Sequence, residues 1–158
     1  MKILITGVAG FLGSHLAQNL SESGHKIIGV DNMMGGYEDN IPKNINFYSA
    51  DCCNLEKMNE IMKSVVVVYH CAATAHEGLS VFSPYEISKN NFLASVSVFS
   101  AAISHKVKRI IFCSSMARYG DQKTPFTEDM NPKPIDPYAI SKVAAENVLI
   151  NLCELNNI

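Results

Sequence analysis

Residues 2–16 read KILITGVAGFLGSHL, and this stretch decides the fold. The short apolar run Lys2–Thr6 leads at once into three glycines spaced three residues apart, Gly7, Gly10 and Gly13. At a strand-to-helix junction such glycines permit a tight turn and let a pyrophosphate approach the backbone. The N-terminus of the following helix then offers free N–H groups and a positive dipole end to the phosphates. The stretch therefore predicts a dinucleotide-binding turn, and a merely structural glycine turn is the weaker alternative.

Further short apolar runs recur along the chain, each suited to a strand buried on both faces. With the first run, the expected strands are Lys2–Thr6, Lys26–Val30, Asn46–Ala50, Val65–Cys71 and Arg109–Cys113. Segments with helical spacing lie between several of them. Alternating strands and helices predict right-handed crossovers and a parallel sheet with helices on both faces. The expected fold class is therefore α/β, a Rossmann-type doubly wound parallel sheet.

Three helices are expected from spacing and from start and stop signals. The first carries Leu12, Leu16 and Leu20 on one face and stops at Gly24. The second covers residues 83–105, and the third covers residues 137–152, with Asp136 as N-cap and Pro137 in first position. The stretch 120–134, rich in Pro, Asp and Thr, is expected to form a long loop near the active face.

Composition limits the possible functions. With 158 residues, 47% of them hydrophobic and 18% charged, the chain is expected to form one domain with a buried core, residues 1–158. A net charge of -2 gives no general attraction for nucleic acid or membranes, and no apolar run is long enough to span a bilayer. The glycines that interrupt the apolar N-terminus argue against a signal peptide.

The cysteines and histidines argue against a metal site. The five cysteines, at 52, 53, 71, 113 and 153, show no C-x-x-C pair and no zinc-ligand spacing, and the five histidines are scattered. An odd number of cysteines without a disulfide framework fits a reducing cytoplasm. We therefore expect a cytoplasmic protein that binds no metal.

The second expected strand leads into Asp31, whose carboxylate can accept hydrogen bonds from the adenosine ribose and would repel a 2′-phosphate. Asn32 follows, and no Arg or Lys appears before Lys43. These residues favour NAD over NADP. Ordinary solvation of an acidic strand end is the alternative.

Tyr138 and Lys142 form Y-x-x-x-K, an i, i+4 pair on one face of the last helix. The strand before that helix ends in Cys113, Ser114 and Ser115, which places hydroxyls at the carboxyl edge of the sheet, where α/β proteins bind ligands. A surface Tyr and Lys on a solvated helix is the alternative, and the nearby serines and the glycine turn disfavour it.

Taken together, ITGVAGFLGSHL, VDN, HCAA at 70–73, CSSMARYGD at 113–121 and PYAISKVAAE at 137–146 resemble the extended short-chain dehydrogenase/reductases. Within that superfamily they are most similar to nucleotide-sugar epimerases of the UDP-glucose 4-epimerase type, part of the NAD-dependent epimerase/dehydratase family. The similarity runs along nearly the whole chain. Two residues depart from the pattern: Arg118 stands where a small apolar residue is usual, and Cys113 replaces a frequent Ser.

The resemblance implies roles for individual residues. Tyr138 would be the acid/base, Lys142 would bind the nicotinamide ribose, and Ser115 would hydrogen-bond the reacting sugar oxygen. Asn91 would support the active site. The implied cofactor-binding residues are Gly7, Gly10, Phe11, Leu12, Gly13, Asp31, Asn32, Asp51, Cys52, Cys71, Ala72, Ala73, Ser114, Tyr138 and Lys142, with Asp51 and Cys52 facing the adenine.

The implied reaction is epimerisation of a nucleotide sugar, most simply a UDP-hexose, through a transient 4-keto sugar with NAD retained. Dehydratases of the superfamily carry an Asp-Glu pair directly after the active-site Thr, whereas Met116 and Ala117 stand here. That difference favours an epimerase, while a dehydratase or a reductase remains an alternative.

Relatives of this type continue into a C-terminal domain that binds the sugar nucleotide. The chain is therefore expected to be a truncated member that lacks that domain and to bind NAD with little or no activity alone. The helices at 83–105 and 137–152 resemble those of a four-helix dimer interface, and their small residues (Ala94, Ala101, Ala144 and Ala145) suit close packing. A homodimer is expected, and the alternative is that these faces only cover the sheet.

Overall fold

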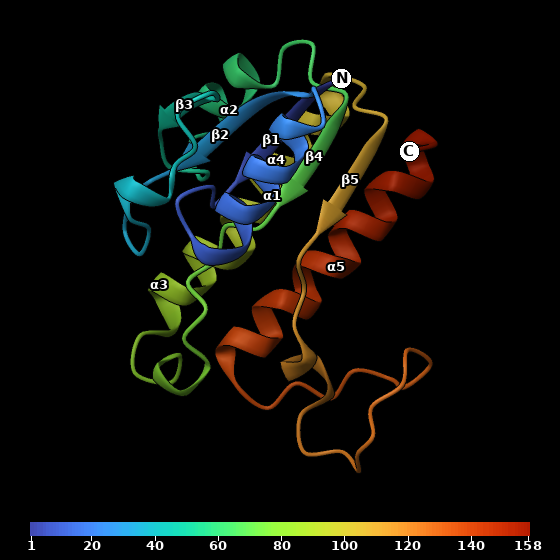
Figure 1. The fold of residues 1–158 in the computed structure, drawn as a ribbon. Helices are drawn as coiled ribbons and strands as arrows, with labels where there is room; N and C mark the ends of the chain where they lie inside the picture. Colours follow the sequence, from blue (N-terminus) through green and yellow to red (C-terminus); the bar gives the residue numbers. More distant parts are fainter.

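The computed structural model describes residues 1–158, with five strands in one parallel sheet of order β3-β2-β1-β4-β5 (Figure 1). The strands are β1 (Lys2–Thr6), β2 (Lys26–Asp31), β3 (Asn46–Ser49), β4 (Val67–His70) and β5 (Arg109–Phe112). This order matches the first five strands of the doubly wound dinucleotide-binding sheet. The predicted Rossmann-type parallel sheet is confirmed, and every expected strand lies within one or two residues of its expected bounds.

Helices cover both faces of the sheet, as Figure 1 shows. Helix α1 (Phe11–Glu22) covers one face, where Ile3 and Ile5 of β1 pack with Ala17. Helices α2 (Leu55–Ile61), α4 (Ala94–Ser104) and α5 (Pro137–Asn156) cover the other face, where Leu4 belongs to a larger core cluster with Phe99. Successive β1 residues therefore serve opposite cores, as the period of two in a strand requires.

The register brings the carboxyl ends of all five strands to one edge. Val67 of β4 pairs with Arg109 of β5, and His70 pairs with Phe112. The strand order switches sides at β1, since β2 and β3 are added on one side of β1 and β4 on the other. In open α/β sheets ligands bind outside the carboxyl ends at such a switch point.

The helix expected over residues 83–105 forms in three parts. Helix α3 (Pro84–Ser88) leads into a π-turn over Lys89–Leu93, which continues as α4. The buried residue in the π-turn is Asn91, a polar side chain that no apolar periodicity could place. The expected helix is correct in extent, and its interruption was not predicted.

The other differences from the expected elements are small. The stretch 120–134 contains neither helix nor strand, as expected, and follows a 3₁₀ turn at Met116–Tyr119. Helix α5 continues to Asn156, four residues beyond its expected end, and α2 was not predicted. No helix in the structure is both long and apolar enough to cross a membrane.

The small residues expected at a dimer interface pack within the chain itself. Ala94, Ala101 and Ala145 are buried in the chain's own core cluster, and Ala144 is half-buried. Their small side chains therefore let α4 and α5 pack on the sheet, as the alternative reading proposed.

Candidate functional site

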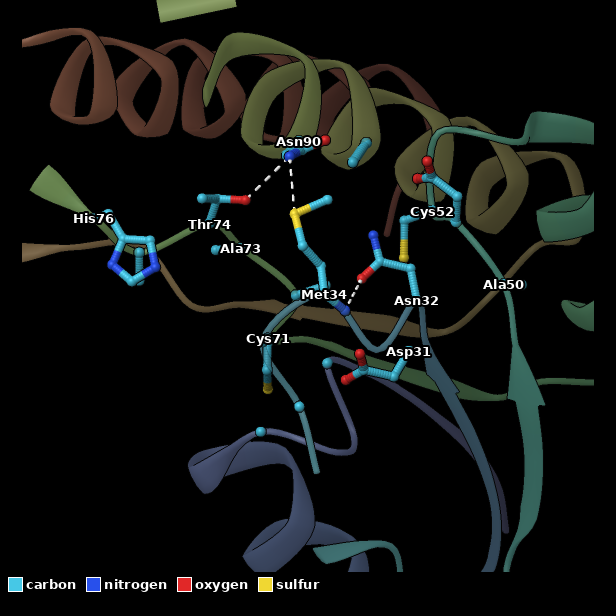
Figure 2. A pocket seen from close by; sticks show the side chains of 18 residues that line it. Asp31, Asn32, Met34, Ala50, Cys52, Cys71, Ala73, Thr74, His76 and Asn90 are labelled. Atoms are coloured by element: carbon cyan, nitrogen blue, oxygen red, sulfur yellow. Dashed lines mark hydrogen bonds between the residues drawn. The ribbon is translucent and has the colours of Figure 1, made fainter. Parts of the chain in front are cut away.

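A cleft of about 360 Å³ opens at the carboxyl edge of the sheet (Figure 2). Its walls come from the loops after β1, β2, β3 and β4 and from the start of the helical segment that follows β4. Many residues implied in cofactor binding line it, namely Gly7, Gly10, Asp31, Asn32, Asp51, Cys52, Cys71, Ala72 and Ala73. The structure thus brings residues from four separate loops into one cleft.

The glycine turn has the geometry that its sequence predicts. Gly7 has a φ of 70°, and a Cβ there would lie 2.8 Å from the backbone nitrogen of Ala72. A Cβ on Gly13 would collide with the carbonyl oxygen of Gly7, so α1 starts very close to the turn. Phe11 and Leu12 lie in the first turn of α1 and are exposed, outside the cleft lining. At Gly7 and Gly10 the turn therefore presents bare backbone to the cleft.

Asp31 fixes the turn as well as lining the cleft. Its carboxylate accepts hydrogen bonds from the N–H groups of Ala9 at 3.0 Å and Met33 at 2.8 Å. The residue is only 9% exposed, so simple solvation does not explain this strand-end carboxylate. A carboxylate has about four acceptor positions, and these two bonds leave capacity for ribose hydroxyls.

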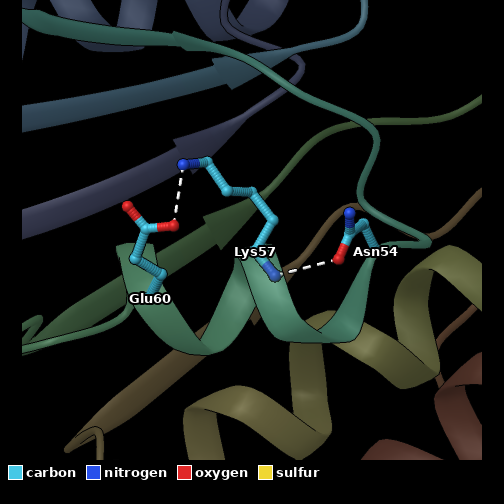
Figure 3. Close-up of polar contacts among 3 residues, drawn as sticks. All are labelled: Asn54, Lys57 and Glu60. Carbon is cyan, nitrogen blue, oxygen red and sulfur yellow. Dashed lines mark hydrogen bonds and ion pairs between the residues drawn. The ribbon is translucent and has the colours of Figure 1, made fainter.

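The turn after β3 supplies the side of the cleft formed by Asp51 and Cys52. The Asp51 carboxylate accepts a hydrogen bond from the Cys53 N–H at 2.8 Å, and Cys52 is buried. Burial raises the pKa of the Cys52 thiol to about 12, so this cysteine is a neutral, apolar wall. Asn54 then caps α2 by accepting from the Lys57 N–H at 2.9 Å (Figure 3).

Asn91 holds the wall that follows β4. Its side chain is fully buried, accepts from the Thr74 N–H at 2.7 Å and donates to the Thr74 carbonyl at 3.2 Å. The neighbouring Asn90 lines the cleft and donates to the Thr74 hydroxyl at 3.2 Å (Figure 2). The paired bonds fix the loop's backbone, which fits the supporting role that the family resemblance implied for Asn91.

Sequence reasoning missed several lining residues: Met34, Gly35, Gly36, Ala50, Thr74, Ala75, His76, Asn90 and Ala94. For Thr74, Ala75 and His76 a signal existed, because they directly follow the HCAA segment at the end of a strand. Met34 lies in the loop between β2 and β3, and nothing in its sequence context indicated that this loop folds back over the turn. The structure shows this path of the loop, because the Asn40 side chain donates a hydrogen bond to the Ala9 carbonyl at 2.9 Å.

Helix α5 begins where the sequence predicts and carries the Y-x-x-x-K pair. Asp136 caps it by accepting from the Ala139 N–H at 2.9 Å, with Pro137 in the first position. Tyr138 is 7% exposed and packs with Ile87 and Ala117, so it is no surface tyrosine. The Ser115 hydroxyl accepts from the Ala117 N–H at 3.2 Å and caps the short 3₁₀ turn after β5.

Lys142 is buried beside the end of β5. Its Nζ donates to the main-chain carbonyl of Cys113 at 2.7 Å, and the residue is 3% exposed. Burial lowers the pKa of Lys142 to about 8, although the neighbouring Cys113, Cys71 and Glu146 oppose that shift. Lys142, Tyr138, Ser114 and Ser115 lie outside the residues that line the cleft.

The sequence profile of the NAD dependent epimerase/dehydratase family matches residues 3–158. The chain belongs to this family. The expected family membership is therefore confirmed, and NAD is the cofactor on which the family depends.

Individual relatives narrow the similarity. The chain is 31% identical over 152 residues to a UDP-glucose 4-epimerase of Streptomyces lividans, covering 94% of this chain and 46% of that protein. The Thermotoga maritima UDP-glucose 4-epimerase, solved with UDP-glucose, superposes with a TM-score of 0.95 at 35% identity, covering all of this chain and 53% of that one. The Brucella ovis UDP-glucose 4-epimerase, solved with NAD, gives 0.93 at 31% identity, covering 99% and 49%. The chain thus spans about half the length of these relatives.

Arg118, one of the two departures from the family pattern, forms an ion pair. Its guanidinium group lies 3.2 Å from the carboxylate of Glu146 on α5, and Ser114 donates a hydrogen bond to the same carboxylate. The Arg118 Nε is buried without a hydrogen-bond partner. In this member of the epimerase/dehydratase family, the segment after β5 is therefore joined to α5 by an ion pair as well as by Lys142.

Proposed function

We propose that this chain binds NAD in the cleft and carries the proton-transfer residues of a nucleotide-sugar 4-epimerase. The observation that carries the proposal is the convergence of Gly7, Asp31 and Asp51, from three loops, on one cleft at the switch point of a family-type sheet. The glycine turn would receive the pyrophosphate, Asp31 and Asn32 the adenosine ribose, and the turn at Asp51 and Cys52 the adenine.

Three residues would handle the sugar. Tyr138 would take the proton from the C4 hydroxyl and return it after the 4-keto sugar has presented its other face. Lys142 would bind the nicotinamide ribose through its ammonium group. Ser115 would hydrogen-bond the reacting oxygen. Bound NAD supplies the hydride acceptor and then the donor, so the net redox change is zero.

The residues after Ser115 favour epimerisation over dehydration. Loss of water needs an extra acid and base, and Met116 and Ala117 provide neither, because their side chains carry no titratable group. Similarity to UDP-glucose 4-epimerases along 94% or more of the chain supports the same choice and a UDP-hexose substrate. A simple reductase, which would need only the serine, tyrosine and lysine, is the alternative.

Calorimetric titration tests the cofactor site. We expect NAD to bind at least about tenfold more tightly than NADP, since that ratio needs only ~1.4 kcal/mol of repulsion between Asp31 and a 2′-phosphate. Asp31→Asn should weaken NAD binding and narrow the preference, whereas Asp39→Asn, at an exposed position, should change neither. Equal affinity of the unaltered protein for both cofactors would contradict the assignment.

Turnover is tested separately with UDP-galactose in a coupled assay that detects UDP-glucose. Tyr138→Phe should abolish any turnover while NAD binding persists, and native mass spectrometry should show NAD retained through the reaction. Release of NADH on addition of the sugar nucleotide would instead identify a dehydrogenase.

A second candidate is NAD binding without turnover. The chain spans about half the length of the epimerases that it resembles, and this observation favours the second candidate for the 158-residue chain by itself. Calorimetry that shows NAD binding, together with a silent coupled assay, would establish it. Robust turnover would exclude it.

We also propose a homodimer through the segments at 83–105 and 137–152. The alanines of these segments pack within the chain, but other apolar side chains on them are exposed and support the proposal. Leu93 is 51% exposed, Ile140 53% and Ile150 55%. Light scattering should show a dimer that Ile140→Glu disrupts, whereas Leu79→Glu, outside these segments, should leave it intact.

The five free thiols support the expected cytoplasmic location.

A further inference from the structure

Cys71 and Cys113 lie side by side at the carboxyl ends of β4 and β5. Each follows the last registered pair of these strands, His70 with Phe112, and their sulfur atoms are 3.6 Å apart. The Cys113 N–H also donates to the His70 carbonyl at 3.1 Å, so the ladder continues to this position. Neighbouring strands are about 4.8 Å apart, within the Cα separations that a disulfide accepts.

The surroundings make one of these two thiols a good nucleophile. The hydrogen bond between the two thiols lowers the pKa of Cys113 to about 6, and the Lys142 ammonium assists against the opposing effect of burial. The same hydrogen bond, together with burial, raises the pKa of Cys71. Burial also raises the pKa values of Cys52, Cys53 and Cys153. A thiolate near neutral pH beside a protonated thiol is the arrangement of an attacking cysteine and a resolving cysteine.

Both thiols are accessible enough to react. Cys71 and Cys113 are half-buried, and Cys71 lines the cleft, so a small oxidant can reach the pair.

We propose that Cys71 and Cys113 form a redox-active dithiol that closes to a disulfide when a peroxide or a low-molecular-weight disulfide oxidises it. The proposal concerns a modification site beyond the proposed NAD-dependent function and does not rest on it. Closure needs only a rotation of the two side chains toward each other, because the strands are already neighbours.

With hydrogen peroxide the atoms and electrons balance in two steps. The Cys113 thiolate attacks one peroxide oxygen, forming an S–O bond while the O–O bond breaks, and the departing hydroxide takes up a proton to become water. The Cys71 sulfur then attacks the Cys113 sulfenic acid, so that the S–S bond forms and a second water leaves. Two thiols have lost two electrons and two protons, and one peroxide has become two waters.

Oxidation would change the neighbourhood of Lys142. The Cys113 thiolate is the largest of the negative influences that raise the pKa of Lys142. A disulfide carries no charge, so closure removes that influence and favours the neutral amine. Oxidation of the dithiol would thereby shift Lys142 toward its uncharged form.

The test uses the full chain with its five cysteines. After treatment with hydrogen peroxide or glutathione disulfide, intact mass should fall by two hydrogen atoms, and peptide mapping under non-reducing conditions should link Cys71 to Cys113. Dithiothreitol should restore the mass. Cys71→Ser and Cys113→Ser should each abolish the link, while Cys52→Ser and Cys153→Ser should preserve it. A linked pair other than these two, or five free thiols after oxidation, would overturn the proposal.

A second measurement guards against a variant that fails to fold. In the unaltered protein at pH 7, iodoacetamide should label Cys113 about tenfold faster than Cys153, because more of Cys113 is thiolate. Phenylarsine oxide bridges two neighbouring thiols. Added before iodoacetamide, it should block the labelling of Cys71 and Cys113 together and leave the labelling of Cys153 unchanged. Equal labelling rates, or separate protection of the two cysteines, would contradict a shared dithiol. None of these measurements requires NAD to bind.

Discussion

The Arg118 guanidinium group lies 3.2 Å from the Glu146 carboxylate, and the two side chains are only 27% and 14% exposed. The pair joins the 3₁₀ turn after β5 to the helix that carries Tyr138 and Lys142. Because Ser114 donates to the same carboxylate, loss of the arginine would leave a largely buried negative charge with one neutral partner.

Arg118→Ala should therefore lower the free energy of unfolding by about 1–3 kcal/mol, the usual cost of leaving a shielded charged group without its partner. A double-mutant cycle with Glu146→Ala, followed by urea unfolding, measures the coupling between the two residues. The matched control is the exposed pair of Lys57 and Glu60, 2.8 Å apart, for which the same cycle should give no measurable coupling (Figure 3). Equal coupling in the two cycles would contradict the prediction.

Lys142→Met should stabilise the fold and weaken cofactor binding. Burial lowers the pKa of Lys142 from 10.5 to about 8, so its ammonium costs roughly 3 kcal/mol of stability at pH 7. The variant also loses the hydrogen bond to the Cys113 carbonyl, which lowers its stability by about 1 kcal/mol. The net expectation is an unfolding free energy higher by about 1–2 kcal/mol, with an NAD dissociation constant at least about tenfold larger.

The pH dependence checks the cause of that stabilisation. Between about pH 8 and 10.5 the unfolded chain keeps a proton on Lys142 that the folded protein has lost, so the stability of the unaltered protein rises with pH relative to the variant. Urea unfolding at pH 7 and pH 9.5 should show the gap between the two proteins narrowing. A constant gap would mean that the buried ammonium is not its source.

His70 should make the fold sensitive to mild acid. It is fully buried, bonded to the hydroxyls of Thr6 at 2.6 Å and Ser95 at 2.9 Å, and burial lowers its pKa from 6.5 to about 3. Between these values the unfolded chain binds a proton that the folded chain does not, so stability falls as pH drops from 6.5 toward 3. The loss should reach a few kcal/mol by pH 4.

His70→Gln keeps a side chain that can donate and accept, and it should remove this part of the pH dependence. His15→Gln, at an exposed position, should leave it in place. Unfolding free energies measured at pH 7, 6, 5 and 4 compare the three proteins, and parallel curves for all three would contradict the assignment to His70.

Gly7→Ala should cost more than a positive φ alone explains. Gly7 and Gly24 have φ values of 70° and 82°, but a Cβ meets backbone 2.8 Å away at Gly7 and nothing within 4 Å at Gly24. Gly24→Ala should lose only the ~1–2 kcal/mol of left-handed strain. Gly7→Ala should lose about 3 kcal/mol or more, and NAD binding with it, whereas Gly24→Ala should still bind NAD. Equal losses in urea unfolding would show that the contact with Ala72 is unimportant.

The strands and the cleft could be predicted because the relevant information is local. A buried parallel strand needs a short apolar run, and its next residue falls at the ligand-binding edge whatever the rest of the chain does. This is why Asp31 could be assigned to the cofactor site from its place at a strand end, whereas Cys71 was assigned only through the family resemblance. The N-cap at Asp136 was predictable for the same reason, since its bond to Ala139 spans three residues.

What was missed depends on contacts between distant segments. Helix α2 has only seven residues, and its signals, a cap at Asn54 and a few buried positions such as Met58, are too sparse for a periodicity. Asn90 lines the cleft because Asn91 is tied to Thr74, seventeen residues earlier in the chain. The contact of Cys71 with Cys113 spans 42 residues and follows from strand order, which no single segment encodes.

The π-turn at Lys89–Leu93 has a consequence for the helix that contains it. One more residue than an α-helix would use lies in this turn, and each residue turns an α-helix by about 100°. The angular phase of α3, where Ile87 meets Tyr138, is thus offset from that of α4, which packs on the sheet. Deleting a single residue here would rotate Ile87 away from Tyr138 while α4 stayed in place. Substitution at an exposed position of the turn such as Leu93 should leave the fold of the single chain intact, whereas deletion or insertion of one residue should not.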